Sequence, residues 1–250
     1  MKILALESSA ITASVAVTED ETLLAQSFQN SGLTHSATLM PMVADLLKNT
    51  GLTLEEMDVI AVAAGPGSFT GVRIGVAVAK GLAWPGDKPC APCSTLESMA
   101  WQCAHVGGEI CAAMDARRNQ VYCARFLAEN GALTRLTPDR AMGLDELAAE
   151  VRASGKLQIL VGDGAHLAQK ALEEQGLPCA LMPAHLRYQT AWGVARCALE
   201  LAREGRLVSA AAMAPSYHRL SQAERERLRR EEAGQEKSAA PGKAAENRGV

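Results

Sequence analysis

One continuous segment, from Ile60 to Ala83, constrains the fold more than any other part of this chain. A short apolar run of strand length opens it, and a glycine-containing turn then leads into a helix with almost no polar face. Ser68 or Thr70 can cap this helix, because a hydroxyl group at the N-cap accepts a hydrogen bond from a free backbone N–H. Small residues recur at every fourth position, at Gly71, Gly75, Ala79 and Ala83. Because a helix that is apolar nearly all round is buried on more than one side, we expect it to pack on its own sheet and on a second surface.

Two other interpretations of this segment are less favoured. A glycine-rich turn before a helix can hold phosphate, since helix N-termini bind anions. The turn from Gly65 to Gly71, however, lacks both the Lys-Ser/Thr end of a P-loop and the spacing of a dinucleotide fingerprint. The apolar run is shorter than the roughly 20 residues that a membrane span needs, and Arg73 and Lys80 interrupt it. We therefore expect a structural turn and no membrane association.

Composition limits the remaining function classes. The chain has 250 residues, a net charge of −3 and 48% apolar residues, which is enough for one large domain or two lobes. This charge is not that of a broadly basic nucleic-acid surface, and no DNA partner is expected. The N-terminus has no signal-peptide pattern, and the seven cysteines form no regular framework. These features predict a cytoplasmic protein with reduced thiols, with Cys90 and Cys93 as two unconnected thiols in a loop.

The order of elements repeats in the two halves of the chain. In the first half we expect strands at 2–8, 13–18, 23–28 and 58–63, helices at 35–49 and 70–83, and a short helix at 95–103. In the second half we expect strands at 109–114, 121–126, 133–136 and 157–161, and helices at 144–153, after 162–164, and at 190–204. This pattern predicts an α/β protein of two duplicated lobes, 1–106 and 107–220, with mixed sheets and flanking helices. The last helix is a candidate to pack back on the first lobe, and the charged segment 221–250 is expected to be disordered.

Two duplicated lobes that each open with a polar hairpin turn resemble the actin, Hsp70 and sugar-kinase superfamily (ASKHA fold). In that fold, the two turns face each other across a cleft and hold nucleotide phosphates. The resemblance implies a nucleotide site here at the first turn, at the second turn and at a glycine turn near adenosine. Its candidate residues are Glu7, Ser8, Asp115, Gly162, Asp163 and Gly164. From the residues alone, the same positions also fit a polar strand end, a solvated turn and a helix cap, so both interpretations stay open.

Four segments carry a closer resemblance: ILALESS, GPGSFTGVRIGVAVAKGLA, DARRNQVY and Pro215-Ser216-Tyr217. They are similar to the TsaB (YeaZ) family, although Glu7 stands where the family usually has Asp and His218 where it usually has Leu. The resemblance implies a non-catalytic scaffold subunit that pairs with TsaD, which carries the catalytic site. With the ATPase TsaE, these proteins form N6-threonylcarbamoyladenosine beside the anticodon of tRNA. It also implies a homodimer when the protein is alone, only indirect contact with tRNA, no intrinsic cofactor, and ATP or ADP only within the complex.

The residues support a non-catalytic role independently of that resemblance. The five histidines are His35, His105, His166, His185 and His218, and no two of them are four positions apart. The helical His-x-x-x-His metal pair of TsaD-like proteins is therefore missing, and we expect neither a metal site nor catalytic residues. The most suggestive nucleophiles are Ser8, Ser9 and Ser68, but no histidine can be assigned as a base beside them, as a serine triad requires. A stand-alone nucleotide-dependent phosphotransferase is the alternative, with a peptidase a more distant one.

The two helices of the first half are candidates for a partner interface. On the first helix, the stripe consists of Leu39, Met42, Val43, Leu46 and Leu47. On the second, the candidates are Gly71, Val72, Arg73, Gly75, Val76 and Ala79. A homologous partner would present the same two helices and give a four-helix contact. The alternative is that both stripes lie in the chain's own core, as in any amphipathic helix.

Overall fold

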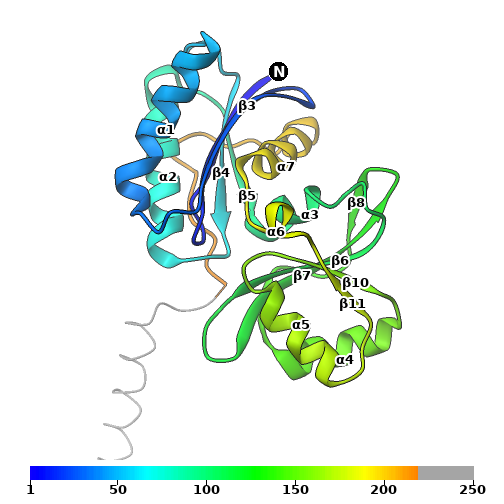
Figure 1. Cartoon of the computed structure of the whole chain (residues 1–250). Coiled ribbons are helices and arrows are strands. Elements are labelled where there is room, and N and C mark those ends of the chain that lie inside the picture. The colour runs from blue at the N-terminus through cyan, green and yellow to red at the C-terminus, as the bar shows by residue number, and fades with distance from the viewer. Residues whose placement is uncertain (219–250) are drawn as a thin grey trace, which may run out of the picture. The chain divides into compact units, whose positions relative to one another are not determined.

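The structure is a computed structural model that describes residues 1–218. Its first lobe is built on a five-stranded sheet of order β3-β2-β1-β4-β5 (Figure 1). The strands are β1 (Lys2–Glu7), β2 (Ala13–Glu19), β3 (Thr22–Gln29), β4 (Val59–Gly65) and β5 (Cys90–Ser94). β1 pairs antiparallel with β2 and parallel with β4. The strands β1 and β4 are buried on both sides, which explains their nearly continuous apolar sequences.

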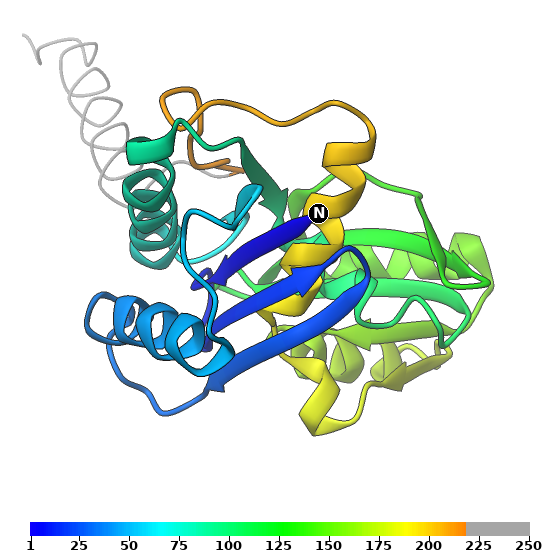
Figure 2. The same cartoon turned by 90° about the horizontal axis from the view of Figure 1, so that it is seen from above.

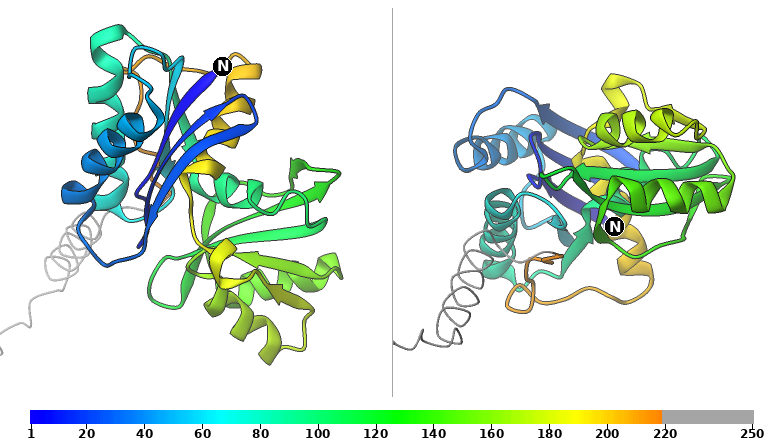
Figure 3. Two further views of the ribbon diagram at one scale, coloured as in Figure 1. Left: turned by 45° about the horizontal axis from the view of Figure 1, so that its top comes forward. Right: turned by 90° about the horizontal axis from the view of Figure 1, so that it is seen from below.

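Helices cover both faces of this first sheet. α1 (His35–Thr50) and α2 (Phe69–Ala83) lie on one face, and α7 (Ala191–Arg203) lies on the other (Figures 2 and 3). Successive β1 residues point to opposite sides, so that Leu4 packs with α1 and α2 whereas Ile3 packs with α7. A short 3-10 helix, η1 (Trp84–Gly86), follows α2. Ser68 caps α2 by accepting a hydrogen bond from the backbone N–H of Gly71, and the left-handed Gly51 ends α1.

The second sheet repeats the strand order of the first. Its order is β11-β10-β6-β7-β8, and β9 pairs with β7 beside this path. The strands are β6 (Gly108–Asp115), β7 (Gln120–Glu129), β8 (Ala132–Arg135), β9 (Arg140–Gly143), β10 (Gln158–Val161) and β11 (Cys179–Leu181). α4 (Leu144–Ser154) and α5 (Ala165–Glu174) pack on one face, α3 (Thr95–Trp101) packs on the other, and α6 (Ala184–Arg187) follows β11. In each sheet, the first strand in sequence lies between the second strand, with which it pairs antiparallel, and a later strand, with which it pairs parallel: β4 in the first sheet and β10 in the second. This shared arrangement confirms an α/β fold of two duplicated lobes.

The structure corrects several details of the sequence interpretation. Cys90 and Cys93 lie in the edge strand β5, not in a loop, and both are buried free thiols. Pro92 is compatible with this strand because an edge strand can leave one backbone position unpaired. Besides β5, four short elements were not expected from sequence: η1, β9, β11 and α6. The chain after α7 also returns to the first lobe, where Val208 bridges to Cys90. The segment 221–250, expected to be disordered, lies outside the described residues.

Within residues 1–218, no helix is both long and apolar enough to cross a membrane.

Candidate functional site

The turn between β1 and β2 is closed. Glu7, at the end of β1, is fully buried, and its Oε1 accepts hydrogen bonds of 2.6 Å from both the backbone N–H and the hydroxyl group of Ser9. Its Oε2 has no hydrogen-bond partner among the described residues. Burial raises the pKa of Glu7, the Ser9 hydrogen bonds lower it and the charge of Asp163 raises it, so that the result is about 7. The carboxyl group therefore holds its proton to a higher pH than an ordinary glutamate.

The glycines of the central motif seal this turn. A Cβ atom on Gly71 would lie 2.1 Å from the carbonyl oxygen of Ser8, and one on Gly67 would lie 2.4 Å from that of Ser9. The hydroxyl group of Ser8 donates a 2.9 Å hydrogen bond to the carbonyl oxygen of Gly71, and the backbone N–H of Ser68 donates one of 2.7 Å to that of Ser9. Only glycine permits this approach. The small-residue row therefore packs against the chain's own first turn.

The turn between β6 and β7 has the opposite character. Arg117, Arg118 and Asn119 are exposed and adopt left-handed backbone conformations with φ of 65°, 55° and 59°. The backbone N–H of Arg117 donates a 2.7 Å hydrogen bond to Oδ1 of Asp115, which fixes the start of the turn. This turn presents its side chains to solvent.

The glycine turn at 162–164 lies against the second hairpin. A Cβ atom on Gly164 would lie 2.6 Å from the carbonyl carbon of Met114, and the backbone N–H of Gly164 donates a hydrogen bond to the carbonyl oxygen of Ala113. Between these glycines, Asp163 accepts a 2.8 Å hydrogen bond from Nε2 of Gln189. Burial raises the pKa of Asp163, although the Gln189 hydrogen bond opposes that shift.

Gln189 links the two lobes at this point. Its side chain holds Asp163, and its carbonyl oxygen accepts a hydrogen bond of 3.1 Å from the hydroxyl group of Thr12 in the first turn. The structure thus brings together the predicted residues Glu7, Asp163 and Asp115: the charge of Asp163 raises the pKa of Glu7, and the charge of Asp115 raises the pKa of Asp163. Sequence reasoning missed Gln189 because no motif marks it. The first turn is a poor phosphate site, since it offers a buried carboxyl group and two buried serines where a phosphate needs cations.

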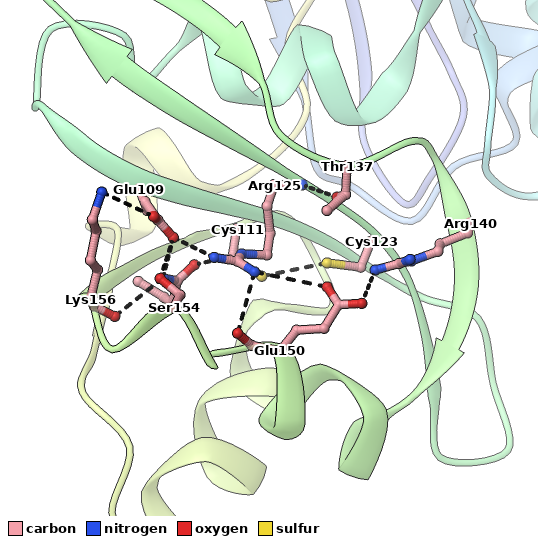
Figure 4. Close-up of polar contacts among 10 residues, drawn as sticks. Glu109, Cys111, Cys123, Arg125, Thr137, Arg140, Glu150, Ser154 and Lys156 are labelled. Carbon is pink, nitrogen blue, oxygen red and sulfur yellow. Dashed lines mark hydrogen bonds and ion pairs between the residues drawn. The ribbon is translucent and has the colours of Figure 1, made fainter. Parts of the chain in front are cut away.

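A buried ion network holds the other end of the second sheet (Figure 4). Glu109 accepts hydrogen bonds from Arg125, Ser154 and Gln158, and Arg125 and Arg140 both pair with Glu150. Burial alone would raise the pKa of Glu109, but these hydrogen bonds and the charge of Arg125 outweigh it and lower the pKa to about 2. Every charge here has its partner within the lobe, which indicates a structural role. Within residues 1–218, no three His, Cys, Asp or Glu side chains form a group that could hold a metal ion.

The structure places most of the predicted interface residues inside the first lobe. Leu39, Met42, Val43, Leu46, Gly71, Val72, Gly75, Val76 and Ala79 are buried in the chain's own core. The physical reason is that both stripes face the sheet and the sealed turn. Of the predicted set, only Arg73 is exposed, and Leu47 is partly buried.

Other residues form the outer surface of the helix pair. They are Met40, Ala77 and Gly81, which are exposed, and Leu47, Ile74 and Val78, which are partly buried. We call these six residues the α1–α2 face. A partner contact through α1 and α2 stays a prediction. The predicted contact surface is now the α1–α2 face and not the buried stripes.

Comparisons with known proteins agree with this architecture. A family model described as TsaD, tRNA N6-adenosine threonylcarbamoyltransferase, matches residues 25–162. The tRNA threonylcarbamoyladenosine biosynthesis protein TsaB of Bacillus subtilis (strain 168) is 34% identical over 174 residues, covering 70% of this chain and 76% of that protein. The Escherichia coli (strain K12) protein of the same name is 40% identical over 134 residues, covering 52% of this chain and 58% of that protein. The solved structure of YeaZ from Pseudomonas aeruginosa superposes with a TM-score of 0.75 at 27% identity, covering 86% of this chain and 99% of that one. With these matches and its duplicated fold, the chain belongs to the TsaB (YeaZ) family.

Proposed function

We propose that this chain is a non-catalytic, cytoplasmic subunit that pairs with TsaD, and with TsaE, in forming N6-threonylcarbamoyladenosine in tRNA. Its relatives are named for the biosynthesis of this nucleoside. The observation that carries the non-catalytic part is the sealed first turn. Where the superfamily resemblance implied a phosphate site, Ser8 and Ser9 are fully buried and the backbone of α2 fills the space beside them.

The pairing part is supported by the α1–α2 face. Partly buried apolar side chains and the exposed small residues Ala77 and Gly81 would let a helix of another subunit approach closely. The TsaD family model covers residues 25–162, so α1 and α2 lie within the region that the two families share. A related subunit would therefore offer a matching pair of helices, and a second copy of this chain would do the same in a homodimer.

An omission series tests this proposal. TsaD, TsaE, the threonylcarbamoyl adenylate, tRNA and this chain are combined, each protein is left out in turn, and modified adenosine is measured on the tRNA. We expect no product without TsaD and a large loss of product without this chain. Product from this chain, the adenylate and tRNA alone would contradict the proposal.

Calorimetry with ATP and magnesium tests the state of the nucleotide site. We expect weak or no binding by the isolated chain, because the first turn is closed and ATP would be held only within the complex. Tight, magnesium-dependent binding to the isolated chain would instead favour the phosphotransferase alternative.

A further inference from the structure

Arg73 stands in a preformed aromatic stack beside the α1–α2 face. Its guanidinium carbon lies 3.6 Å from the ring centre of Phe69 and 5.7 Å from that of Tyr217. The two rings stack on each other at 4.8 Å, and Nε of Arg73 donates a 2.7 Å hydrogen bond to the hydroxyl group of Tyr217. An arginine held by a ring face and a hydrogen bond loses little further conformational freedom on binding.

The backbone around Tyr217 is itself fixed on the first lobe. The N–H of Ser216 donates a 2.7 Å hydrogen bond to the carbonyl oxygen of Ala64 at the end of β4. Nζ of Lys80, on α2, donates to the carbonyl oxygens of Ala211 and Met213 at 3.2 and 2.9 Å. The segment that carries Tyr217 is thus tied to α2 at several points, and the position of Arg73 is set by the fold.

The terminal nitrogens of this guanidinium have no hydrogen-bond or ion-pair partner among residues 1–218. In the part of the chain that the structure describes, Arg73 makes no ion pair, and its only hydrogen bond uses Nε. Three other described arginines differ in this respect, since Arg125, Arg135 and Arg140 each pair with a carboxylate. An exposed, oriented guanidinium whose fork is free is suited to a carboxylate from outside the chain.

From this placement we infer that Arg73 is a preorganised anchor, which receives a carboxylate of the protein partner docked on the α1–α2 face. This inference rests on the proposed function, with TsaD as the partner. The face favours protein over an RNA backbone because its six residues are uncharged and Lys80, the other cation of α2, is already used on backbone carbonyls. A phosphate backbone is held by several cations at once, and of the two cations on α2 only Arg73 is free to bind a phosphate.

The test is the binding kinetics of the full chain with TsaD. Arg73→Ala should weaken binding by about 30-fold, chiefly through faster dissociation, as for one partner of a close charge pair between subunits. Arg73→Met keeps an unbranched side chain beside Phe69 but removes the charge and the Nε–H donor, and it should lose nearly as much affinity. The matched control is Arg152→Ala on α4, another exposed helical arginine that makes one side-chain hydrogen bond. The control should bind within twofold of the wild type.

Salt dependence separates an intermolecular ion pair from internal packing. The effect of Arg73→Met on affinity should shrink between 50 and 500 mM salt, because salt screens the lost attraction in the wild type. An equal loss at both salt concentrations would assign Arg73 to holding Tyr217 only, and would overturn the inference. Two other results for Arg73→Met would also overturn the inference. One is unchanged binding to TsaD together with weaker binding of tRNA to the complex, and the other is an effect seen only in the homodimer. Failure of the wild-type chain to bind TsaD would overturn the proposed function together with the anchor, whereas equal binding by wild type and Arg73→Met would overturn the anchor alone.

Discussion

The first hairpin turns of the two lobes occupy the same place in a duplicated topology but are built in opposite ways. The β1–β2 turn is buried beneath the glycines of α2, whereas the β6–β7 turn places Arg117 and Arg118 in solvent. A ligand that bridges two lobes through such turns needs both to be open. The difference teaches that a duplicated fold can keep its strand order while one lobe converts its turn into core.

Two buried glutamates on the equivalent strands β1 and β6 show the same contrast in their electrostatics. Glu7 has no cation beside it, and burial raises its pKa to about 7. Glu109 is also buried, but Arg125 and three hydrogen bonds lower its pKa to about 2. The first lobe therefore holds a carboxyl group that gains a proton on folding, and the second holds one that stays ionised.

The largest expected effect on stability comes from opening the sealed turn. Gly71→Ala places a methyl group 2.1 Å from a backbone carbonyl oxygen, which neither side can avoid without moving the turn or α2. We expect a loss of more than about 4 kcal/mol in the free energy of unfolding, measured by chemical denaturation.

Gly81 on the same helix is the control. It is exposed, and nothing lies within 4 Å of an added Cβ atom. Gly81→Ala should stabilise the protein by roughly 0.5–1 kcal/mol, the ordinary gain of alanine over glycine within a helix. If Gly71→Ala were as stable as Gly81→Ala, the first turn would not be sealed in the way described.

The second effect comes from the ion network of the second lobe. Glu109→Gln leaves the buried Arg125 with only part of its compensating charge. Removal of one partner from a buried pair costs about 3–5 kcal/mol, and denaturation at pH 7 should show a loss near the lower end because Glu150 remains. A change below 1 kcal/mol would mean that Glu150 alone compensates Arg125.

The third effect is the pH dependence contributed by Glu7. Its pKa is 4.5 ordinarily and about 7 in the folded protein, so the folded state binds more protons between these values. Below about pH 4.5, the contribution of Glu7 to the free energy of unfolding is fully present. It is lost as the pH rises toward 7, and above pH 7 the protein is about 3 kcal/mol less stable than it is near pH 4.5. Glu7→Gln should remove the dependence, so that the variant equals the wild type near pH 4.5 and exceeds it at pH 8.

Denaturation of both proteins across this pH range measures the gap between them. A gap that stays constant with pH would show that Glu7 titrates normally in the folded protein.

The smallest expected effect on stability lies on the outer side of α2. Ala77→Lys changes an exposed residue for another good helix former, and the free energy of unfolding should change by less than about 0.5 kcal/mol. The same change places a charge in the α1–α2 face and should abolish binding to TsaD. The adjacent substitution Val76→Lys should unfold the lobe, since Val76 is buried. Full binding by Ala77→Lys would place the partner elsewhere.

These variants also show what the sequence could and could not predict. The repeated order of strands and helices correctly predicted two duplicated lobes. The apolar sequence of α2 predicted burial on more than one side, but the structure leaves Arg73, Ala77 and Gly81 exposed. The sequence could not tell which surface covers the glycines, because a row of small residues looks the same whether it meets a partner or the Ser8–Ser9 backbone. The sequence also failed to predict β11 and α6, because these segments are too short to show a periodic pattern.

The candidate site was predictable only in part. The polar turns marked Glu7, Asp115 and Asp163, and the structure does bring them near one another. Neither the closure of the first turn nor the role of Gln189 has a local sequence pattern, since both depend on contacts between segments far apart in the chain. The stack of Arg73 on Tyr217 joins residues 144 positions apart and could not be read from either one.

The most direct test of a non-catalytic role is turnover by the reconstituted complex with Glu7→Gln and Asp163→Asn combined in this chain. Both changes keep shape and hydrogen bonding but remove the two carboxyl groups at which superfamily-type chemistry would occur. We expect formation of modified adenosine within twofold of the wild-type complex. A drop of 100-fold or more, with TsaD binding and folding unchanged, would contradict the central claim and place catalysis in this chain.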